Sequence, residues 1–177
     1  MTEEARNIFL IGYRGTGKTT VARLLGARLD RKWVDADDEL EKEAGRTIKQ
    51  IFAEDGESVF RDLETRGLCR LATAETRVVA LGGGVILRDE NRRILKTGAV
   101  VWLQAAAETI SQRVASDPTT DERRPNLTAS GGYDEICRLL RDRLPLYQQC
   151  ADVEVDTEGR TPDQIVDVIL SALGIKS

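Results

Sequence analysis

The segment Ile8-Phe9-Leu10-Ile11-Gly12-Tyr13-Arg14-Gly15-Thr16-Gly17-Lys18-Thr19 decides the fold of this chain. Its first four residues are apolar and bulky, which predicts a short buried strand. After Thr19, apolar side chains recur every three or four positions from Val21 to Leu29, which predicts a helix. Between the two lies the pattern G-x-x-x-x-G-K-S/T, which is typical of a phosphate-binding loop in the strand-then-helix context that this motif requires.

The residue types of this loop suit the binding of a triphosphate. Glycine at positions 12, 15 and 17 permits positive φ angles, so that the backbone can curl around a phosphate group. The N–H groups of such a loop and the N-terminus of the following helix attract anions. Lys18 adds a positive charge for the β- and γ-phosphates, and the Thr19 hydroxyl is a ligand for Mg²⁺. We therefore predict a nucleoside triphosphate site formed by Gly12, Gly15, Thr16, Gly17, Lys18, Thr19 and Thr20.

The composition is that of an ordinary globular protein. The chain has 177 residues, of which 41% are hydrophobic and 32% are charged, and this length predicts a single domain over residues 1–177. A net charge of −4 argues against a nucleic-acid-binding surface. No apolar run approaches the ~20 residues that a membrane span needs. We expect a monomer that binds neither nucleic acid nor a membrane.

Cysteine and histidine usage narrows the chemistry. The three cysteines, Cys69, Cys137 and Cys150, are odd in number and scattered, so they predict neither a disulfide framework nor a metal site. Together with an acidic N-terminus that lacks a signal-peptide pattern, this favours the cytoplasm. Because the chain contains no histidine, any general base must be a carboxylate or a lysine.

Strands alternate with helices along the chain, which predicts an α/β fold with a parallel sheet covered by helices on both faces. We predict five strands, near residues 7–11, 33–35, 77–81, 99–103 and 152–155. Helices are predicted after the phosphate-binding loop and over Asp38–Ala44, Ser58–Ala74, Ala106–Val114 and Tyr133–Tyr147. Capping residues predict further helices after Thr47, Asp89 and Thr161. Residues 115–132 interrupt this alternation, and a loop of such length is usually functional or disordered.

Ligands of parallel sheets lie beyond the carboxyl ends of the strands, where two further patterns occur. Asp35 and Asp37 follow the second strand, and their spacing places them on one side of an extended chain. They are either a solvated helix start or, facing a phosphate loop, ligands of a metal and of an acceptor hydroxyl. Gly82, Gly83 and Gly84 follow the third strand, either as a simple turn or because a substrate approaches the backbone.

The arginines offer a last pattern. Those near predicted functional segments are Arg61, Arg113, Arg123, Arg124, Arg143 and Arg160. Each one alone could be an ordinary surface residue. As a set, they indicate an anionic substrate and phosphate charge to be neutralised.

Taken together, these residues resemble the shikimate kinase family, small P-loop kinases of the nucleoside monophosphate kinase structural class. The resemblance covers nearly the whole chain and rests on an ordered set of motifs. These are the phosphate-binding loop, Asp35-x-Asp37, Phe60-Arg61-x-x-Glu64, Gly82-Gly83-Gly84, Arg124-Pro125, Arg143-x-Pro145-Leu146-Tyr147, and Asp156-Thr157 with Arg160 and Pro162. The loop alone is shared by many nucleotide-binding proteins, whereas the ordered set is much more specific.

The resemblance implies a three-layer P-loop kinase fold that phosphorylates the 3-hydroxyl of shikimate with ATP and Mg²⁺. It implies a substrate-binding insert at about residues 36–64 and a mobile lid at about 115–132. Asp37, Arg61, Gly83 and Arg143 would hold shikimate, with Gly82 and Gly84 beside them. Arg124 would reach the phosphates, and Arg113 and Arg160 would lie by the adenine. Asp37, Lys18 and Arg124 would be the catalytic residues, and Thr19 and Asp35 would hold the metal, Asp35 directly or through water.

Two segments depart from the family pattern, and two other functions remain open. The lid motif reads Arg124-Pro125-Asn126-Leu127 where Arg-Pro-Leu is commoner, and the adenine loop reads Asp156-Thr157-Glu158-Gly159-Arg160. A sugar-acid kinase such as gluconate kinase would share the loop and the lid, but not the motifs around Arg61 and Arg143. A non-catalytic nucleotide switch for GTP would need an Asn-Lys-x-Asp signature, and no asparagine here precedes lysine.

Overall fold

The computed structural model describes residues 6–116 and 132–175. Five parallel strands form one sheet in the order β2-β3-β1-β4-β5. They are β1 (Ile8–Ile11), β2 (Lys32–Asp35), β3 (Arg77–Ala80), β4 (Ala99–Gln104) and β5 (Val153–Asp156). The predicted α/β architecture and all five strands are therefore confirmed, with boundaries that differ by at most one residue at each end.

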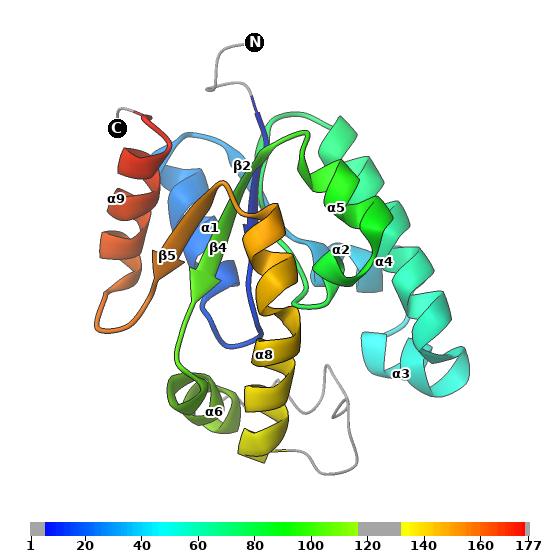
Figure 1. Ribbon diagram of the computed structural model, residues 1–177. Helices are drawn as coiled ribbons and strands as arrows, with labels where there is room; N and C mark the ends of the chain where they lie inside the picture. Colours follow the sequence, from blue (N-terminus) through cyan, green and yellow to red (C-terminus); the bar gives the residue numbers. More distant parts are fainter. Residues whose placement is uncertain (1–5, 117–131, 176–177) are drawn as a thin grey trace.

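Helices cover both faces of this sheet, as predicted (Figure 1). One face carries α1 (Lys18–Arg28) and α9 (Pro162–Ala172), and the other carries α4 (Gly56–Thr73), α5 (Asp89–Leu95) and α8 (Gly132–Cys150). The alternation of side chains along each strand produces these two cores. In β1, Ile8 and Leu10 face α1 and α9, whereas Phe9 and Ile11 face the opposite layer.

A helical segment between β2 and β3 has a small core of its own. It consists of α2 (Ala36–Ala44), α3 (Ile48–Glu54) and the beginning of α4. Leu40, Ile48, Ile51 and Phe60 form its buried cluster. Thr47 and Gln50 form the predicted capping box at the start of α3. In Figure 1 this segment projects from the side of the molecule.

The remaining elements follow β3, β4 and β5 along the chain. The short 3-10 helix η2 (Val85–Leu87) follows β3, and α6 (Ala107–Ser116) follows β4. The capping box of Thr161 and Gln164, with Pro162 at the first helical position, starts α9 as predicted. The carboxyl ends of the strands point toward α6 in Figure 1.

Two local predictions are wrong. Asp89 does not cap a helix, because α5 begins at Asp89 itself and its carboxylate pairs with Arg92 and Arg93. The helix predicted from Asp38 begins at Ala36, because Asp35 caps it through a hydrogen bond from the Asp37 N–H. The predicted helix over Tyr133–Tyr147 is present as α8, which contains Pro145 and extends three residues further, to Cys150.

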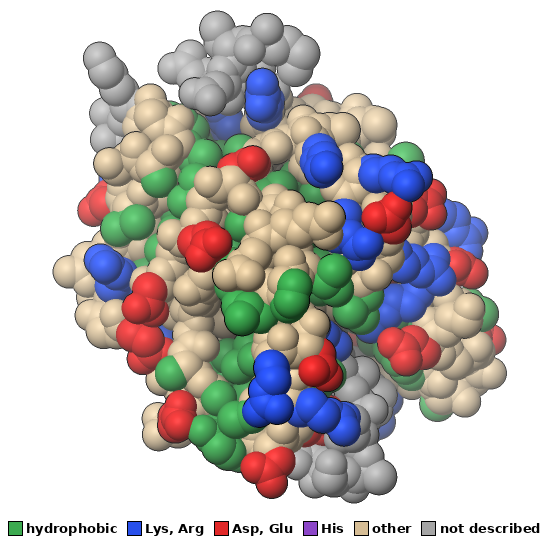
Figure 2. Space-filling model, in the orientation of Figure 1, with side chains coloured by type: hydrophobic (Ala, Val, Ile, Leu, Met, Phe, Trp, Pro, Cys, Tyr) green, Lys and Arg blue, Asp and Glu red, His purple; other side chains and the backbone are tan. Residues whose placement is uncertain are grey.

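The surface mixes charges of both signs. On the face shown in Figure 2, acidic and basic side chains are interspersed. One such pair, Arg88 with Asp62, joins the turn before α5 to α4 at 2.7 Å. No helix within the described ranges has the length and apolar character needed to cross a membrane.

Candidate active site

The phosphate-binding loop between β1 and α1 has the predicted backbone form. Gly12, Gly15 and Gly17 have φ angles of 143°, 80° and 90°, a region that favours glycine. At Gly12 space is also limiting, because a Cβ would lie 2.4 Å from the Leu103 carbonyl oxygen of β4. Substitution of Gly12 would therefore push the loop away from the end of the sheet.

The side chains of this loop hold its curled backbone. Lys18 is largely buried, and its Nζ donates 2.8 Å hydrogen bonds to the carbonyl oxygens of Gly12 and Tyr13. The buried Thr16 hydroxyl donates to the same Tyr13 oxygen at 2.8 Å. Thr20 lies exposed in the first turn of α1. The lysine charge is thus held across the loop, at the N-terminus of α1, where an anion is favoured.

Thr19 and Asp35 lie together although they come from different elements. The Thr19 hydroxyl donates to Asp35 Oδ2 at 2.6 Å, and Asp35 Oδ1 accepts from the Asp37 N–H at 3.0 Å. Burial raises the pKa of the Asp35 carboxyl above its usual value, and the charge of Asp37 adds to this, while the Thr19 hydrogen bond opposes it. Asp35 is therefore both a helix cap and a neighbour of the phosphate-binding loop.

The predicted geometry of Asp37 is wrong in one respect. Asp35 and Asp37 do not share one side of an extended chain, because Asp37 lies in the first turn of α2. Across the described residues, no group of three or more Cys, Asp or Glu side chains could hold a metal by itself. A hydroxyl and a carboxylate are nevertheless oxygen ligands of the type that Mg²⁺ takes together with phosphate oxygens and water.

The glycine triplet after β3 is packed against the phosphate-binding loop and an arginine. A Cβ on Gly83 would lie 3.3 Å from the Gly12 carbonyl oxygen and 3.5 Å from the Arg14 nitrogen. A Cβ on Gly84 would lie 2.5 Å from Arg61 Nη1. Glycine is required here because protein groups approach this closely, which is more than a simple turn demands.

Arg61 and Arg143 reach this triplet from two helices on one side of the sheet. Arg61 of α4 pairs with Glu64 at 2.8 Å and with Glu57 at 3.1 Å, and its side chain is 10% exposed. Arg143 of α8 donates to the Gly83 carbonyl oxygen at 3.2 Å. Within the described residues, no carboxylate forms an ion pair with this buried guanidinium. Its remaining donors suit an anionic ligand.

Of the two arginines predicted beside the adenine, Arg113 contacts the phosphate-binding loop and Arg160 does not. Arg113 of α6 donates to the Gly15 carbonyl oxygen at 3.1 Å. Arg160 lies exposed in the loop between β5 and α9, where its Nε donates to the Asp156 carbonyl oxygen at 3.1 Å. Arg123, Arg124 and most of the predicted lid lie outside the described residues.

Three residues of this site were given no role from the sequence. The Tyr147 hydroxyl donates to the Gly83 carbonyl oxygen at 2.7 Å, beside Arg143, and the i,i+4 spacing of these two on α8 was a usable signal. The Tyr13 ring centre lies 5.9 Å from the Arg143 guanidinium carbon, a cation–π arrangement, and burial raises the pKa of this tyrosine. Glu57 precedes Arg61 by four residues, the spacing of a helical ion pair.

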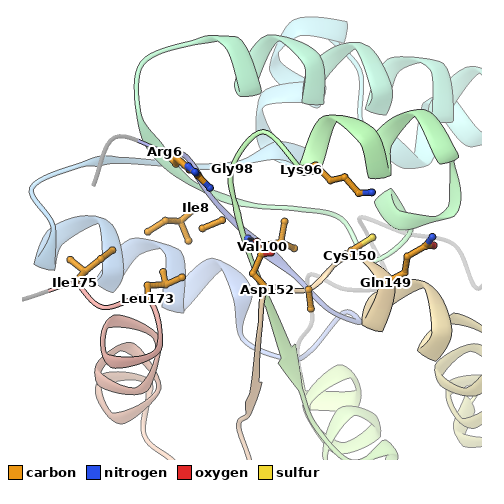
Figure 3. A pocket seen from close by; sticks show the side chains of 12 residues that line it. Arg6, Ile8, Lys96, Gly98, Val100, Gln149, Cys150, Asp152, Leu173 and Ile175 are labelled. Carbon is orange, nitrogen blue, oxygen red and sulfur yellow. Dashed lines mark hydrogen bonds between the residues drawn. The ribbon is translucent and has the colours of Figure 1, made fainter. Parts of the chain in front are cut away.

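A separate hollow of about 400 Å³ lies at the opposite edge of the sheet, near the amino ends of β1 and β4 (Figure 3). Arg6, Lys96, Cys150 and Asp152 are among its lining residues. Burial raises the pKa of the Cys150 thiol, which makes it a poor nucleophile. The predicted site residues do not line this hollow.

Comparison with known proteins agrees with this geometry. The sequence profile of the family described as shikimate kinase matches residues 14–174. A shikimate kinase of Rhodopirellula baltica is 42% identical over 168 residues, which cover 94% of this chain and 90% of the relative. The solved shikimate kinase from Acinetobacter baumannii, in complex with shikimate, has a TM-score of 0.89 and 36% identity, with 97% of this chain and 95% of that chain covered.

A gluconokinase provides a contrast. The structure of this enzyme from Sinorhizobium meliloti 1021 has a TM-score of 0.55 and 15% identity, with 96% of this chain and 92% of that chain covered. At such identity the likeness shows the fold alone. The profile match spans most of the sequence, and the relatives above exceed 30% identity over nearly their full length. The chain therefore belongs to the shikimate kinase family, ATP-dependent kinases with the P-loop kinase fold.

Proposed function

We propose that this protein transfers the γ-phosphoryl group of ATP to the 3-hydroxyl of shikimate, giving shikimate 3-phosphate and ADP. One observation carries this proposal beyond the family assignment. Arg61 and Arg143 converge on the glycine triplet, which itself packs against the phosphate-binding loop. An anion-binding acceptor site therefore adjoins a triphosphate site, as transfer between two bound substrates requires.

The acceptor side of the site would hold the carboxylate and the ring hydroxyls. Arg61 and Arg143 would bind the carboxylate of shikimate, and the backbone of Gly82, Gly83 and Gly84 would lie against its ring. Glu57 and Glu64 hold the guanidinium group of Arg61 in place. The Gly83 carbonyl oxygen and the Tyr13 ring hold the guanidinium group of Arg143. A planar guanidinium held in this way recognises a carboxylate better than a mobile one.

The transfer step itself needs orientation and charge neutralisation. The 3-oxygen of shikimate forms a bond to the γ-phosphorus while the bond from that phosphorus to the bridging oxygen of ADP breaks, and the hydroxyl proton passes to the Asp37 carboxylate. Lys18 stabilises the charge on the transferring group. In a loose transition state the carboxylate mainly orients the hydroxyl.

Mg²⁺ fits the residues beside the loop. Thr19 and Asp35 would hold it, Asp35 either directly or through a water molecule, and it would neutralise phosphate charge. The Thr19–Asp35 hydrogen bond of 2.6 Å shows that both groups can face one point. Arg113 and Arg160 would flank the adenine, and Gly12, Gly15, Thr16, Gly17 and Thr20 would contact the phosphates.

Several features of this proposal rest on sequence alone. These are the single domain over residues 1–177, the substrate-binding insert near 36–64, the mobile lid near 115–132 with Arg124, the monomeric state and the cytoplasmic location. We also propose that neither nucleic acid nor a membrane is a partner, in keeping with the net charge of −4.

A coupled ADP-release assay tests the function directly. Shikimate, gluconate and nucleoside monophosphates are supplied in turn as acceptors, with an acceptor-free reaction as the control. Of these acceptors, we expect only shikimate to raise ADP release well above the control. The product should carry phosphate on the 3-oxygen of shikimate. Preferred turnover of gluconate would favour a sugar-acid kinase, and acceptor-independent hydrolysis would favour a nucleotide switch.

A further inference from the structure

The N-cap residue of helix α6 has no side chain that could cap the helix. The first intrahelical hydrogen bond runs from the Ile110 N–H to the Ala106 carbonyl oxygen at 3.0 Å, so Ala106 is the N-cap residue. The residues before the first helical residue, Ala107, are Gln104, Ala105 and Ala106. None of them offers the short side-chain oxygen that a helix N-terminus prefers. The N–H groups at the start of α6 therefore have no acceptor from an N-cap side chain.

Glu158 supplies that acceptor from the loop between β5 and α9. Its Oε1 accepts from the Ala106 N–H at 2.9 Å, and its Oε2 accepts from the Thr109 hydroxyl at 3.0 Å. In a capping box, a glutamate at the third helical position accepts from the N-cap N–H. Thr109 occupies that position here, so Glu158 performs the task from a point 52 residues along the chain. Its negative charge also suits the helix N-terminus.

The loop that carries Glu158 is held at several points. We call residues 156–160 the base loop, because Arg160, placed beside the adenine in the proposed function, lies in it. The buried Thr157 hydroxyl and N–H both bond to the Gln104 carbonyl oxygen, at 2.8 Å and 2.9 Å. The Glu158 N–H donates to Asp156 Oδ1 at 3.0 Å. The base loop is thereby attached to the end of β4, and Glu158 attaches it to α6.

The other end of α6 contacts the phosphate-binding loop. Arg113 donates to the Gly15 carbonyl oxygen, and a Cβ on Gly15 would lie 3.2 Å from the Val114 side chain. At the first turn, the Tyr133 hydroxyl of α8 donates to the Glu108 carboxylate. Helix α6 therefore spans the distance between the base loop and the phosphate-binding loop, with Glu158 at one end and Gly15 at the other.

We propose that Glu158 is a positioning residue for the nucleotide, which sets the base loop relative to the phosphate-binding loop through α6. The inference rests on the proposed function, since it takes Arg113 and Arg160 to flank the base. Its consequence is selectivity: Glu158 favours nucleotides that carry a base over bare polyphosphate. A bare polyphosphate contacts only the phosphate-binding loop and gains nothing from the base loop.

The test compares the binding of MgADP and of Mg-pyrophosphate by titration calorimetry. For Glu158→Ala, we expect the ADP dissociation constant to rise about 3- to 10-fold, the scale of a lost cap interaction, while that of pyrophosphate stays unchanged. The matched control is Glu154→Ala, which removes a carboxylate bonded at 2.9 Å to Gln104 but not to α6. This control should bind both ligands normally.

A second variant separates positioning from simple helix stabilisation. Ala106→Ser provides α6 with a local cap, so the double variant Ala106→Ser/Glu158→Ala should recover the melting temperature lost in Glu158→Ala. If Glu158 positions the base loop, the weaker ADP binding should persist in the double variant. Recovery of ADP affinity together with melting temperature would overturn the proposal, as would normal ADP affinity in Glu158→Ala.

Failure of this inference differs visibly from failure of the proposed function. Binding of ADP and pyrophosphate is measured without an acceptor, so it does not depend on shikimate turnover. If the wild-type protein phosphorylates shikimate but Glu158→Ala weakens ADP and pyrophosphate equally, the function stands and the positioning role is wrong. If the wild-type protein does not release ADP with shikimate, the proposed function is wrong.

Discussion

The Thr19 hydroxyl donates a 2.6 Å hydrogen bond to Asp35 Oδ2, which joins the phosphate-binding loop to the end of β2. The same carboxylate caps α2 through the Asp37 N–H. One side chain therefore links three elements of the site. Its burial and the nearby charge of Asp37 raise its pKa, so the ionised form of this carboxyl is less favourable in the folded protein than in the unfolded chain.

The variant Asp35→Asn should raise the stability of the ligand-free protein at pH 7. Because the folded-state pKa lies above that of the unfolded chain, the stabilisation from the neutral carboxyl is present at low pH and lost as the pH rises through the folded pKa. The variant, which has no carboxylate to ionise, should melt at a higher temperature than the wild type at pH 7. The difference should vanish toward about pH 4, near the unfolded pKa.

Glu75→Gln is the control for that comparison, because Glu75 forms an exposed ion pair with Lys32 that lowers its pKa. It should not raise the melting temperature at pH 7. A melting temperature of Asp35→Asn below that of the wild type at pH 7 would show that the cap and hydrogen bond of the ionised carboxylate outweigh its burial. Shikimate phosphorylation should fall in Asp35→Asn in either case, since the charge beside Thr19 is lost.

Lys18→Met should reduce turnover by about 10²-fold or more, because the charge at the transferring phosphoryl group is lost. The Lys18 amine also donates to the Gly12 and Tyr13 carbonyl oxygens, so a small loss of stability should accompany the change. Turnover and melting temperature are measured together, with the surface variant Lys32→Met as the control. Near-normal turnover in a folded Lys18→Met protein would contradict the role of the loop.

Gly84→Ala should weaken the binding of shikimate while leaving the binding of ATP nearly unchanged. The new Cβ would lie 2.5 Å from Arg61 Nη1, so the Arg61 guanidinium must shift, and a lower melting temperature should accompany the change because Arg61 is paired with the buried Glu64. The displaced guanidinium would lose a charge-assisted contact with the carboxylate, and the KM for shikimate should rise about tenfold. Gly67→Ala is the control, since its nearest neighbour would lie 3.9 Å away. Equal KM values for the two variants would count against Arg61 as a shikimate ligand.

Arg61→Ala and Arg143→Ala should both weaken the binding of shikimate much more than the binding of ATP. Only Arg61→Ala should strongly lower the free energy of unfolding. Arg61 pairs with Glu64, which is 7% exposed, so its loss removes a buried ion pair and should cost about 3 kcal/mol. Arg143 donates only to a carbonyl oxygen among the described residues. Urea unfolding and separate KM values for both substrates measure the difference. A selective rise in the KM for ATP would contradict the assignment.

The parts of the fold with local signals were predictable from the sequence. The apolar runs of β1, β3 and β4 and the glycines of the phosphate-binding loop have one physical explanation each, and the structure agrees with it. Arg61 and Glu64, quoted from the sequence only as part of a family motif, have the i,i+3 spacing of a helical contact, and the structure shows that contact at 2.8 Å. Such contacts fall within one turn, so secondary structure alone determines them.

Other parts depend on choices that the sequence leaves open. Asp35 and Asp89 both stand at helix starts, yet only Asp35 is the cap, because the chain turns into α2 directly after the end of β2. This choice also decided where Asp37 lies. The hydrogen bond from the Ala106 N–H to Glu158 joins residues 52 positions apart, so no local sequence pattern predicts it. Tertiary packing decides these cases.

Asp37 is the only residue proposed to accept the proton of the shikimate 3-hydroxyl. Asp37→Asn retains the backbone N–H that donates to Asp35 Oδ1, so α2 and its cap should persist. With no histidine in the chain, loss of this carboxylate removes the group that orients the 3-hydroxyl and takes up its proton. We expect turnover to fall about 10²-fold or more, on the scale of general-base catalysis, with weaker shikimate binding. ATP binding by titration should barely change, because the phosphate-binding loop is untouched. If Asp37→Asn turns over normally while Asp35→Asn does not, the roles of the two carboxylates are reversed, and the residue that caps α2 would also be the one that receives the proton.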